Sequence, residues 1–414
     1  MEFQTAVLSD KLRVIGVPMP TFRSVSLGLW VDSGSVYEND DTNGISHFIE
    51  HMLFKGTKKR SARQIAEEMD AVGGMLNAFT DVENTCFYTR VLGAHLPLAM
   101  DMISDLVLNS RLDPADVERE KGVVLEEINM AEDTPDDLVF ELLNTAHFGV
   151  QPISRPVLGK AENVSRFTRE DIRAYMDARY RPDGAVLAVA GSYDWDALLA
   201  QAEDLYSCWQ PSGIKRPEIA LAPHEPCVIR REKDMEQTHV CIGFDGPSQL
   251  SDDYYAFSVV NTVLGGSMSS RLFQSIREER GLAYNVFTSL STTLTSGLFS
   301  VYAGMSPENA NQVVELTLKE IEKLGRDGIS RKEFGQAREQ TLSSLIMAME
   351  STSNRMKSAG RRLLMRGDTV TQDELISRIN AIKYEQVNEL AAQLITSKRS
   401  AAIVGADADS VKLG

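Results

Sequence analysis

The chain has 414 residues, a net charge of −16, and 43% hydrophobic and 25% charged residues. This length predicts two domains of about 200 residues each, with the composition of a globular protein. The negative charge argues against a nucleic-acid partner, because proteins that bind nucleic acids present basic patches. No apolar run approaches the roughly 20 residues that span a bilayer, so we expect no membrane partner.

No secretory signal is recognisable at the start of the chain, since no basic segment precedes an apolar one in MEFQTAVLSDKLRVIG. We therefore expect a cytoplasmic protein, most simply a bacterial one. The cysteines show no C-x-x-C pair, which predicts reduced, structural thiols. They are Cys86, Cys208, Cys227 and Cys241. Histidine and carboxylate side chains are then the available metal ligands.

In chain order, the first predicted elements are strands, in KLRVIGV and in SVSLGLWVDSGS, where alternate residues are apolar. A helix is predicted within residues 43–57, NGISHFIEHMLFKGT, because its apolar residues recur at the spacing of a buried helical stripe. Asn43 is the predicted N-cap, and Gly56 marks the end of the apolar run.

This helix carries the pattern H-x-x-E-H, formed by His47, Glu50 and His51. Residues at i and i+4 lie on one face of a helix, so both imidazoles can reach one zinc ion. Glu50 is placed to take a proton from water activated by the ion. The alternative is a pair of core histidines held by hydrogen bonds, but a chance match to the whole pattern is on the order of 1%. The order of residues is that of an inverted zincin.

Further along, Ser61 and Gln64 form a predicted capping box, and the helix that they begin ends at Gly73-Gly74. Two strands joined by a turn follow in MLNAFTDVENTCFYTRVL. A helix then leads to a longer one, with Asp113 as N-cap and Pro114 as its first residue.

A catalytic zinc site takes three protein ligands, so the two histidines require a third donor. The long helix offers four acidic candidates: Glu118, Glu120, Glu126 and Glu127. Glu120 and Glu127 lie two turns apart, on a face shared with Val123 and Val124. Glu126 is aligned with Arg119 and is predicted to face solvent. The residue pattern also allows all four acids to coat an exposed helix, and it leaves these alternatives open.

The second half repeats the order of elements of the first, after the proline-rich stretch WQPSGIKRPEIALAPHEP. It contains no second H-x-x-E-H, and the chain has no phosphate-binding glycine loop. We predict an α+β fold with two similar domains, each a mixed β-sheet with helices packed on one face, closing like a clamshell. The predicted boundaries are 1–212 for the metal-binding domain, 213–226 for a linker and 227–414 for a homologous domain without a metal.

The segment HFIEH, followed by a helix with E-x-x-V-x-x-x-E, resembles the pitrilysin/insulinase family of zinc metallopeptidases. The layout is most similar to the branch that contains the catalytic subunit of mitochondrial processing peptidase and its bacterial relatives. The segments GSVYE, GGMLNAFTDVENTCFY and IREERGLAY also resemble family signatures. The resemblance implies one Zn²⁺ per chain, bound by His47, His51 and Glu127. It implies Glu50 as the catalytic base and Glu120 as the residue that steadies a ligand histidine.

The resemblance also implies that substrate pairs as a β-strand with Asn77, Ala78 and Phe79. Two donors to the oxyanion, Arg277 and Tyr284, would come from the second half. We therefore expect a zinc endopeptidase that cleaves oligopeptides or short unfolded, presequence-like segments in a chamber between two domains. A homodimer, or a heterodimer with a related subunit, is compatible with the family. The alternatives are a non-catalytic assembly subunit related to processing peptidases and a zinc hydrolase for small molecules.

Overall fold

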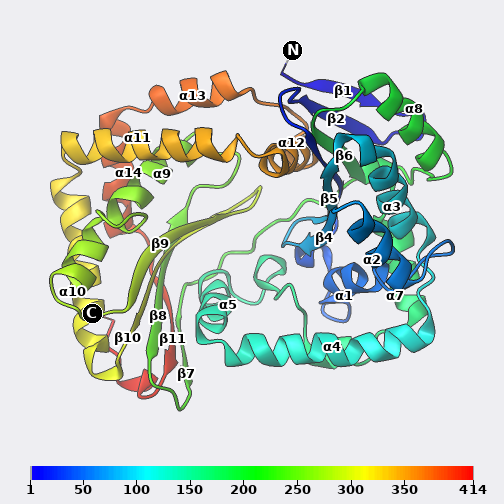
Figure 1. Cartoon of the computed structure of the whole chain (residues 1–414). Coiled ribbons are helices and arrows are strands. Elements are labelled where there is room, and N and C mark those ends of the chain that lie inside the picture. Colours follow the sequence, from blue (N-terminus) through cyan, green and yellow to red (C-terminus); the bar gives the residue numbers. More distant parts are fainter. Residues whose placement is uncertain (1, 414) are drawn as a thin grey trace. The chain divides into compact units, whose positions relative to one another are not determined.

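The computed structural model describes residues 2–413, which form two mixed β-sheets with associated helices (Figure 1). The chain divides into two compact units that interleave along the sequence. Unit 1 comprises the residues up to Ile128, then Arg155–Glu218 and Ile346–Thr371. Unit 2 comprises Asn129–Ser154, Ile219–Leu345 and the residues from Gln372 onward.

Unit 1 contains a six-stranded sheet in the order β1-β2-β6-β3-β5-β4. The strands are β1 (Gln4–Val7), β2 (Arg13–Pro18), β3 (Ser24–Val31), β4 (Met75–Thr80), β5 (Thr85–Leu92) and β6 (Ala185–Gly191). The helices from the first half are α1 (Ile45–Leu53), α2 (Ala62–Ala71), α3 (Leu96–Asn109), α4 (Pro114–Asp133), α6 (Ala161–Val164), α7 (Arg169–Arg179) and α8 (Trp195–Tyr206). The last residues of α4 belong to unit 2.

Unit 2 contains a five-stranded sheet in the order β7-β11-β8-β10-β9. The strands are β7 (Val228–Glu232), β8 (Thr238–Gly246), β9 (Asn285–Thr292), β10 (Gly297–Met305) and β11 (Ser400–Gly405). The helices are α5 (Pro135–Phe148), α9 (Tyr254–Leu264), α10 (Ala310–Asp327), α11 (Arg331–Ala348), α13 (Gln372–Asn380) and α14 (Tyr384–Thr396). A π-helical turn spans Phe273–Glu278, within the segment SSRLFQSIREERG.

The two sheets share one topology once the edge strand β1 is set aside. In each sheet the first and last strands in sequence pair in parallel, β2 with β6 and β7 with β11, and every other neighbouring pair is antiparallel. The strand that follows next in sequence, β3 or β8, lies beside the last one. The predicted fold class, with two similar mixed sheets, is confirmed.

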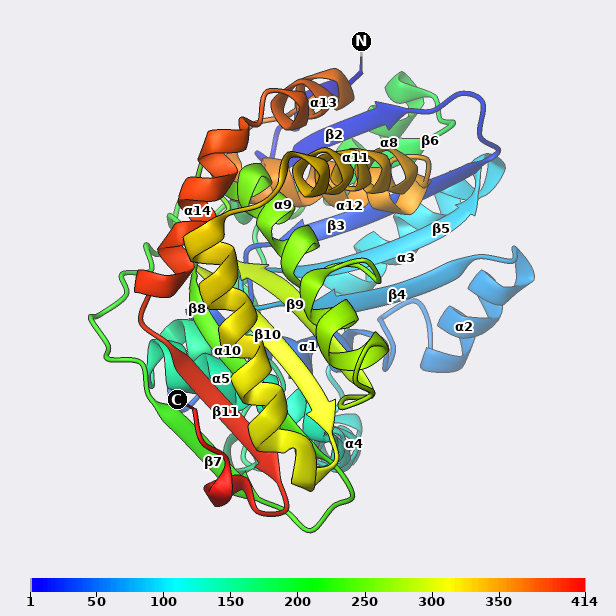
Figure 2. The ribbon, with the colours of Figure 1, turned by 90° about the vertical axis from the view of Figure 1, so that its left-hand side faces the viewer.

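Each half of the sequence contributes one helix to the sheet of the other half. One face of the unit 1 sheet packs against helices of its own half, through Leu27, Leu29 and Val31 of β3. The other face is covered by α12 (Thr352–Arg366), which comes from the second half and lies alongside β3 (Figure 2). In the same way α5, from the first half, packs on β11 and β8 of unit 2. Each half thus covers one face of its own sheet, as predicted, and one face of the other sheet.

Close packing explains why α12 carries a glycine at its centre. A Cβ atom on Gly360 would lie 2.3 Å from Nε1 of Trp30, and one on Gly28 would lie 2.5 Å from Sδ of Met356. The contact is also polar at one end, where the hydroxyls of Ser26 and Thr352 lie 3.0 Å apart. Since each compact unit contains segments from both halves, the boundaries at 212 and 227 stay a prediction about the sequence halves.

Local sequence signals account for several helix ends. The capping box of Ser61 and Gln64 is present at the start of α2, and α4 begins at Pro114 with Asp113 accepting a hydrogen bond from Ala115 N. Between α8 and β7 the chain contains no helix or strand, as its prolines predict.

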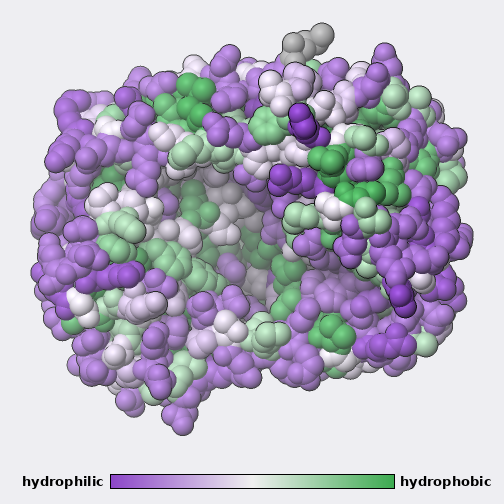
Figure 3. Space-filling model, viewed as in Figure 1, coloured by the Kyte–Doolittle hydropathy of each residue, from purple (hydrophilic) through white to green (hydrophobic). Residues whose placement is uncertain are grey.

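Among residues 2–413, every helix is too short or too polar to span a bilayer. The face drawn in Figure 3 carries mostly hydrophilic residues at its outer surface.

Candidate metal centre

Helix α1 is capped by a buried carboxylate. Its N-cap residue is Gly44, so the prediction of Asn43 as N-cap is wrong. The Asn43 amide instead donates to Oε2 of Glu38, at 2.9 Å. Glu38 also accepts hydrogen bonds from the backbone N–H groups of Gly44 (2.8 Å) and Ser46 (2.9 Å). A negative charge at this position stabilises the positive end of the helix dipole.

The apolar stripe of α1 fixes its rotation. Phe48, Ile49 and Met52 are fully buried in the core of unit 1. The side chains of His47 and His51 then lie at the edge of the core, 12% and 18% exposed. The local pattern therefore places both imidazoles on one side of the helix, where they can meet a third ligand.

That third side chain is Glu127 of α4. Oε2 of Glu127 lies 3.7 Å from Nε2 of His47 and 3.4 Å from Nε2 of His51. The ligand atoms of the three residues all lie within 4.8 Å of one another, and no other such group of His, Cys, Asp and Glu occurs among the described residues. A tetrahedral zinc site with bonds near 2.0–2.1 Å spaces its ligand atoms roughly 3.3 Å apart. The three residues therefore fit a zinc ion.

The four acidic residues of α4 that the sequence left as candidates differ in their burial. Along α4 the buried positions are Val117, Glu120 and Val124, which form one stripe, whereas Glu126 is exposed. Val123 is 42% exposed, so the expectation that it shares this face is wrong. Successive residues of a helix point about 100° apart, so the buried stripe that includes Val124 does not include Val123.

Glu120 is hydrogen-bonded at both carboxylate oxygens. Oε1 lies 2.8 Å from Nδ1 of His51, and Oε2 lies 2.6 Å from Nζ of Lys55. Burial alone would raise the pKa of Glu120, but its bonds to His51 and Lys55 lower the pKa below its usual value. Sequence reasoning missed Lys55. The only signal for it was its position, one helical turn after His51.

Glu50 is held by a residue of the neighbouring sheet. Its Oε2 accepts a hydrogen bond of 2.6 Å from the hydroxyl of Thr80, at the end of β4, which sequence reasoning also missed. Burial raises the pKa of Glu50. A carboxyl group with a raised pKa is better matched to general base catalysis near neutral pH.

The two histidines differ in their electrostatics. Burial, and then the neighbouring imidazole of His51, lower the pKa of His47 to about 4. Burial by itself lowers the pKa of His51, but the hydrogen bond to Glu120 and the charge of Glu127 raise it above its usual value. Nδ1 of His47 is buried without a hydrogen-bond partner. A neutral imidazole is the form that binds a metal ion.

The predicted substrate-binding residues lie on an edge strand. Asn77, Ala78 and Phe79 belong to β4, the last strand in the order of the unit 1 sheet. An edge strand presents backbone N–H and C=O groups to a further strand. The ring of Phe79 packs edge-on against Trp30, with the centroids 5.5 Å apart. Substrate binding by these residues stays a prediction.

The two predicted oxyanion donors are neighbours in unit 2. The guanidinium carbon of Arg277 lies 5.7 Å from the centroid of the Tyr284 ring, and Tyr284 is 73% exposed. Their catalytic role stays a prediction, as does the clamshell closure.

Two family models match this chain. The one described as "Insulinase (Peptidase family M16)" matches residues 13–161, and the one described as "Peptidase M16 inactive domain" matches residues 166–341. A protein of Bacillus subtilis named as an uncharacterized zinc protease is 40% identical over 397 residues, which cover 95% of this chain and 96% of that protein. One of Mycobacterium tuberculosis, named likewise, is 40% identical over 406 residues, covering 96% and 92%.

Solved structures agree in fold. A protease from Helicobacter pylori has a TM-score of 0.91 at 20% identity, covering 97% of this chain and 99% of that one. A structure from Pseudomonas fluorescens, titled as a peptidase M16 inactive domain, has a TM-score of 0.90 at 20% identity, covering 98% of both chains. At such identity the likeness shows the fold alone, but the sequence matches span nearly the whole chain. The chain therefore belongs to the insulinase family of peptidases, family M16.

Proposed function

We propose that this chain is a zinc-dependent endopeptidase that cleaves oligopeptides or short unfolded, presequence-like segments. The observation that carries the proposal is the cluster of His47, His51 and Glu127, with Glu50 beside it, in a chain whose relatives are named zinc proteases. In this proposal the three clustered side chains bind one zinc ion per chain. Such an ion supplies Lewis acidity, which polarises a peptide carbonyl and makes water a better nucleophile.

Glu50 acts as the general base. Its carboxylate accepts a proton from the attacking water and then passes that proton to the leaving amine. The hydrogen bond from Thr80 orients one carboxylate oxygen and leaves the other to exchange the proton. Burial supports this role, because it raises the pKa of Glu50.

The substrate is proposed to bind as an added strand along β4. Backbone pairing recognises any extended peptide, and this would suit a protease with varied substrates. Asn77, Ala78 and Phe79 provide the pairing edge. We further propose that the halves close around the peptide, with Arg277 and Tyr284 as donors to the oxyanion.

The chief alternative is a non-catalytic assembly subunit. The description "inactive domain" applies to the family model that matches residues 166–341, and the candidate metal ligands found among residues 2–413 all lie in the first half. A subunit with only a structural role has no need for a base beside three ligands, so the intact set favours the enzyme. A bacterial cytoplasmic location and a dimer, of this chain alone or with a related subunit, remain parts of the proposal.

The test is an assay on the purified full-length chain. Zinc content is measured by atomic spectrometry, and cleavage is followed with quenched fluorescent peptides of about ten to thirty residues. We expect close to one zinc per chain and cleavage that a chelator abolishes and zinc restores. A chain that binds zinc but cleaves none of these peptides would favour the assembly role. Hydrolysis of small esters or amides alone would favour the small-molecule hydrolase.

A further inference from the structure

Lys55 stands just beyond the end of α1, whose C-cap is Phe54. Its ammonium group lies 2.6 Å from Oε2 of Glu120. The Glu120 side chain is only 3% exposed, and its other oxygen lies 2.8 Å from Nδ1 of His51. The carboxylate therefore joins a lysine on one side to a candidate metal ligand on the other.

Both contacts are needed to define the orientation of the carboxylate. A buried carboxylate with a single partner is costly and can turn about its side-chain bonds, whereas two partners on different oxygens fix its plane. When Nδ1 of His51 donates to that fixed oxygen, its proton is on Nδ1 and the lone pair is on Nε2. Nε2 is the atom that lies 3.4 Å from Glu127.

The position of Lys55 is set independently of the candidate metal site. The segment after α1 forms isolated β-bridges from Gly56 to Ser61 and from Thr57 to Ser110. The hydroxyl of Thr57 donates to Asp105 of α3, at 2.6 Å. The segment is therefore attached to α3 directly after Lys55.

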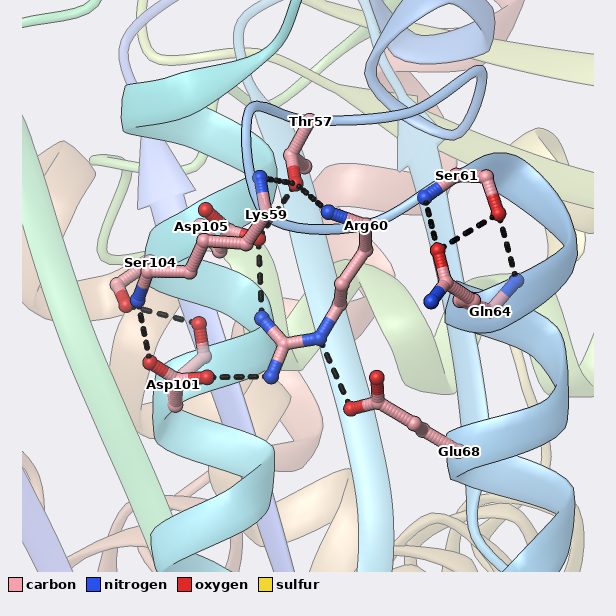
Figure 4. A network of polar contacts seen from close by, with 9 residues as sticks. All are labelled: Thr57, Lys59, Arg60, Ser61, Gln64, Glu68, Asp101, Ser104 and Asp105. Atoms are coloured by element: carbon pink, nitrogen blue, oxygen red, sulfur yellow. Dashed lines mark hydrogen bonds and ion pairs between the residues drawn. The ribbon is translucent and has the colours of Figure 1, made fainter.

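Arg60 strengthens this attachment, as Figure 4 shows. Its guanidinium group binds the carboxylates of Glu68, Asp101 and Asp105, at 2.9 Å for Glu68 and for Asp105. Glu68 lies on α2 and the two aspartates on α3, so one side chain joins the segment to two helices. Only 11% of the Arg60 side chain is exposed, and charge pairs shielded in this way are screened less by solvent.

We propose that Lys55 is a positioning residue of the metal centre. It holds the Glu120 carboxylate in the orientation that keeps Nε2 of His51 directed at the metal. This inference rests on the proposed zinc site and adds to it a residue outside the H-x-x-E-H motif. The loss of such outer contacts typically weakens metal binding about 10- to 100-fold.

The test compares Lys55→Met with Lys58→Met in the full-length chain. Lys58 lies three positions later in the same segment and is exposed, and its side chain makes no ion pair in the described structure. Zinc affinity is measured by competition with a chromophoric chelator, and ligand geometry by the visible spectrum of the Co²⁺-loaded protein. We expect Lys55→Met to bind zinc about 10- to 100-fold more weakly with an altered Co²⁺ spectrum. Lys58→Met should match the wild type in both.

Lys55→Arg provides the rescue, since it keeps a cation that can reach Glu120. It should recover most of the affinity if the cation orients the carboxylate. Unchanged affinity and spectrum in Lys55→Met would overturn the proposal, and so would an equal loss in Lys58→Met. These readouts use no peptide. A wild-type chain that binds no zinc would instead refute the proposed function itself.

Discussion

At the scale of single residues, Glu50 lies beside the three clustered side chains without belonging to them. We expect Glu50→Gln to retain close to one zinc per chain and to lower kcat at least about 10²-fold, because an amide cannot accept the proton. Zinc content and peptide cleavage on the same preparation check this. Loss of the metal in this variant would show that Glu50 is a ligand and not the base.

Two adjacent glutamates of α4 form a matched pair. Glu127 lies within 3.4–3.7 Å of both imidazoles, whereas Glu126 is exposed. Glu127→Gln should weaken zinc binding by at least about 10-fold, because an amide is a poor ligand for zinc. Glu126→Gln should leave both metal content and activity unchanged. The opposite result would show that the third ligand is Glu126 and that the face of the helix has been assigned wrongly.

At the scale of elements, α5 is anchored to the unit 2 sheet by a buried histidine. Nδ1 of His147 lies 3.0 Å from the hydroxyl of Ser400 on β11, and Nε2 lies 3.3 Å from Oδ1 of Asp245. Burial lowers the pKa of His147, while the charge of Asp245 acts in the opposite direction. The folded protein therefore favours the neutral ring.

The lowered pKa of His147 determines how the stability of the folded protein depends on pH. A lowered pKa in the folded state gives a stability contribution that is present above the unfolded value, 6.5, and is lost as the pH falls below it. We expect the thermal midpoint of the wild type to fall between pH 7 and pH 5 more steeply than that of His147→Gln. Parallel curves for wild type and His147→Gln would contradict the assignment.

At the scale of the whole molecule, the first half does not contain all of unit 1. The face of the sheet around Trp30 is covered by α12, from residues 352–366. A fragment of residues 1–212 should expose this apolar face, and we expect it to aggregate or to unfold at lower temperature than the intact chain. Co-expression with residues 213–414 should restore a folded complex. Size-exclusion chromatography and tryptophan fluorescence check this.

This expectation would be contradicted if the fragment of residues 1–212 were monomeric, unfolded cooperatively and showed the emission of a buried tryptophan. The exchange of α5 and α12 would then contribute little to stability. In the expected case, the two halves fold together. The candidate metal site then depends on the second half through α12, although all three of its ligand residues come from the first half.

The sequence by itself determined the local features. The helix of His47, Glu50 and His51 and the capping box at Ser61 depend on spacings of three or four residues, which a helix places on one face whatever surrounds it. The start of α4 depends on two adjacent residues, Asp113 and Pro114. The repeat of element order likewise predicted two similar sheets, and the topology confirms them. Glu127 was assigned by family resemblance, because the residue pattern left four acids open.

Only the tertiary structure decided contacts between distant segments. An apolar stripe predicts that a helix face is buried but not which element covers it, so the exchange of α5 and α12 could not be read from periodicity. Burial along α4 depends on where the helix packs, and this distinguishes Glu120 from Glu126. The contact of Lys55 with Glu120 and the cap of Glu38 on α1 arise from chain folding, because no local spacing brings those side chains together.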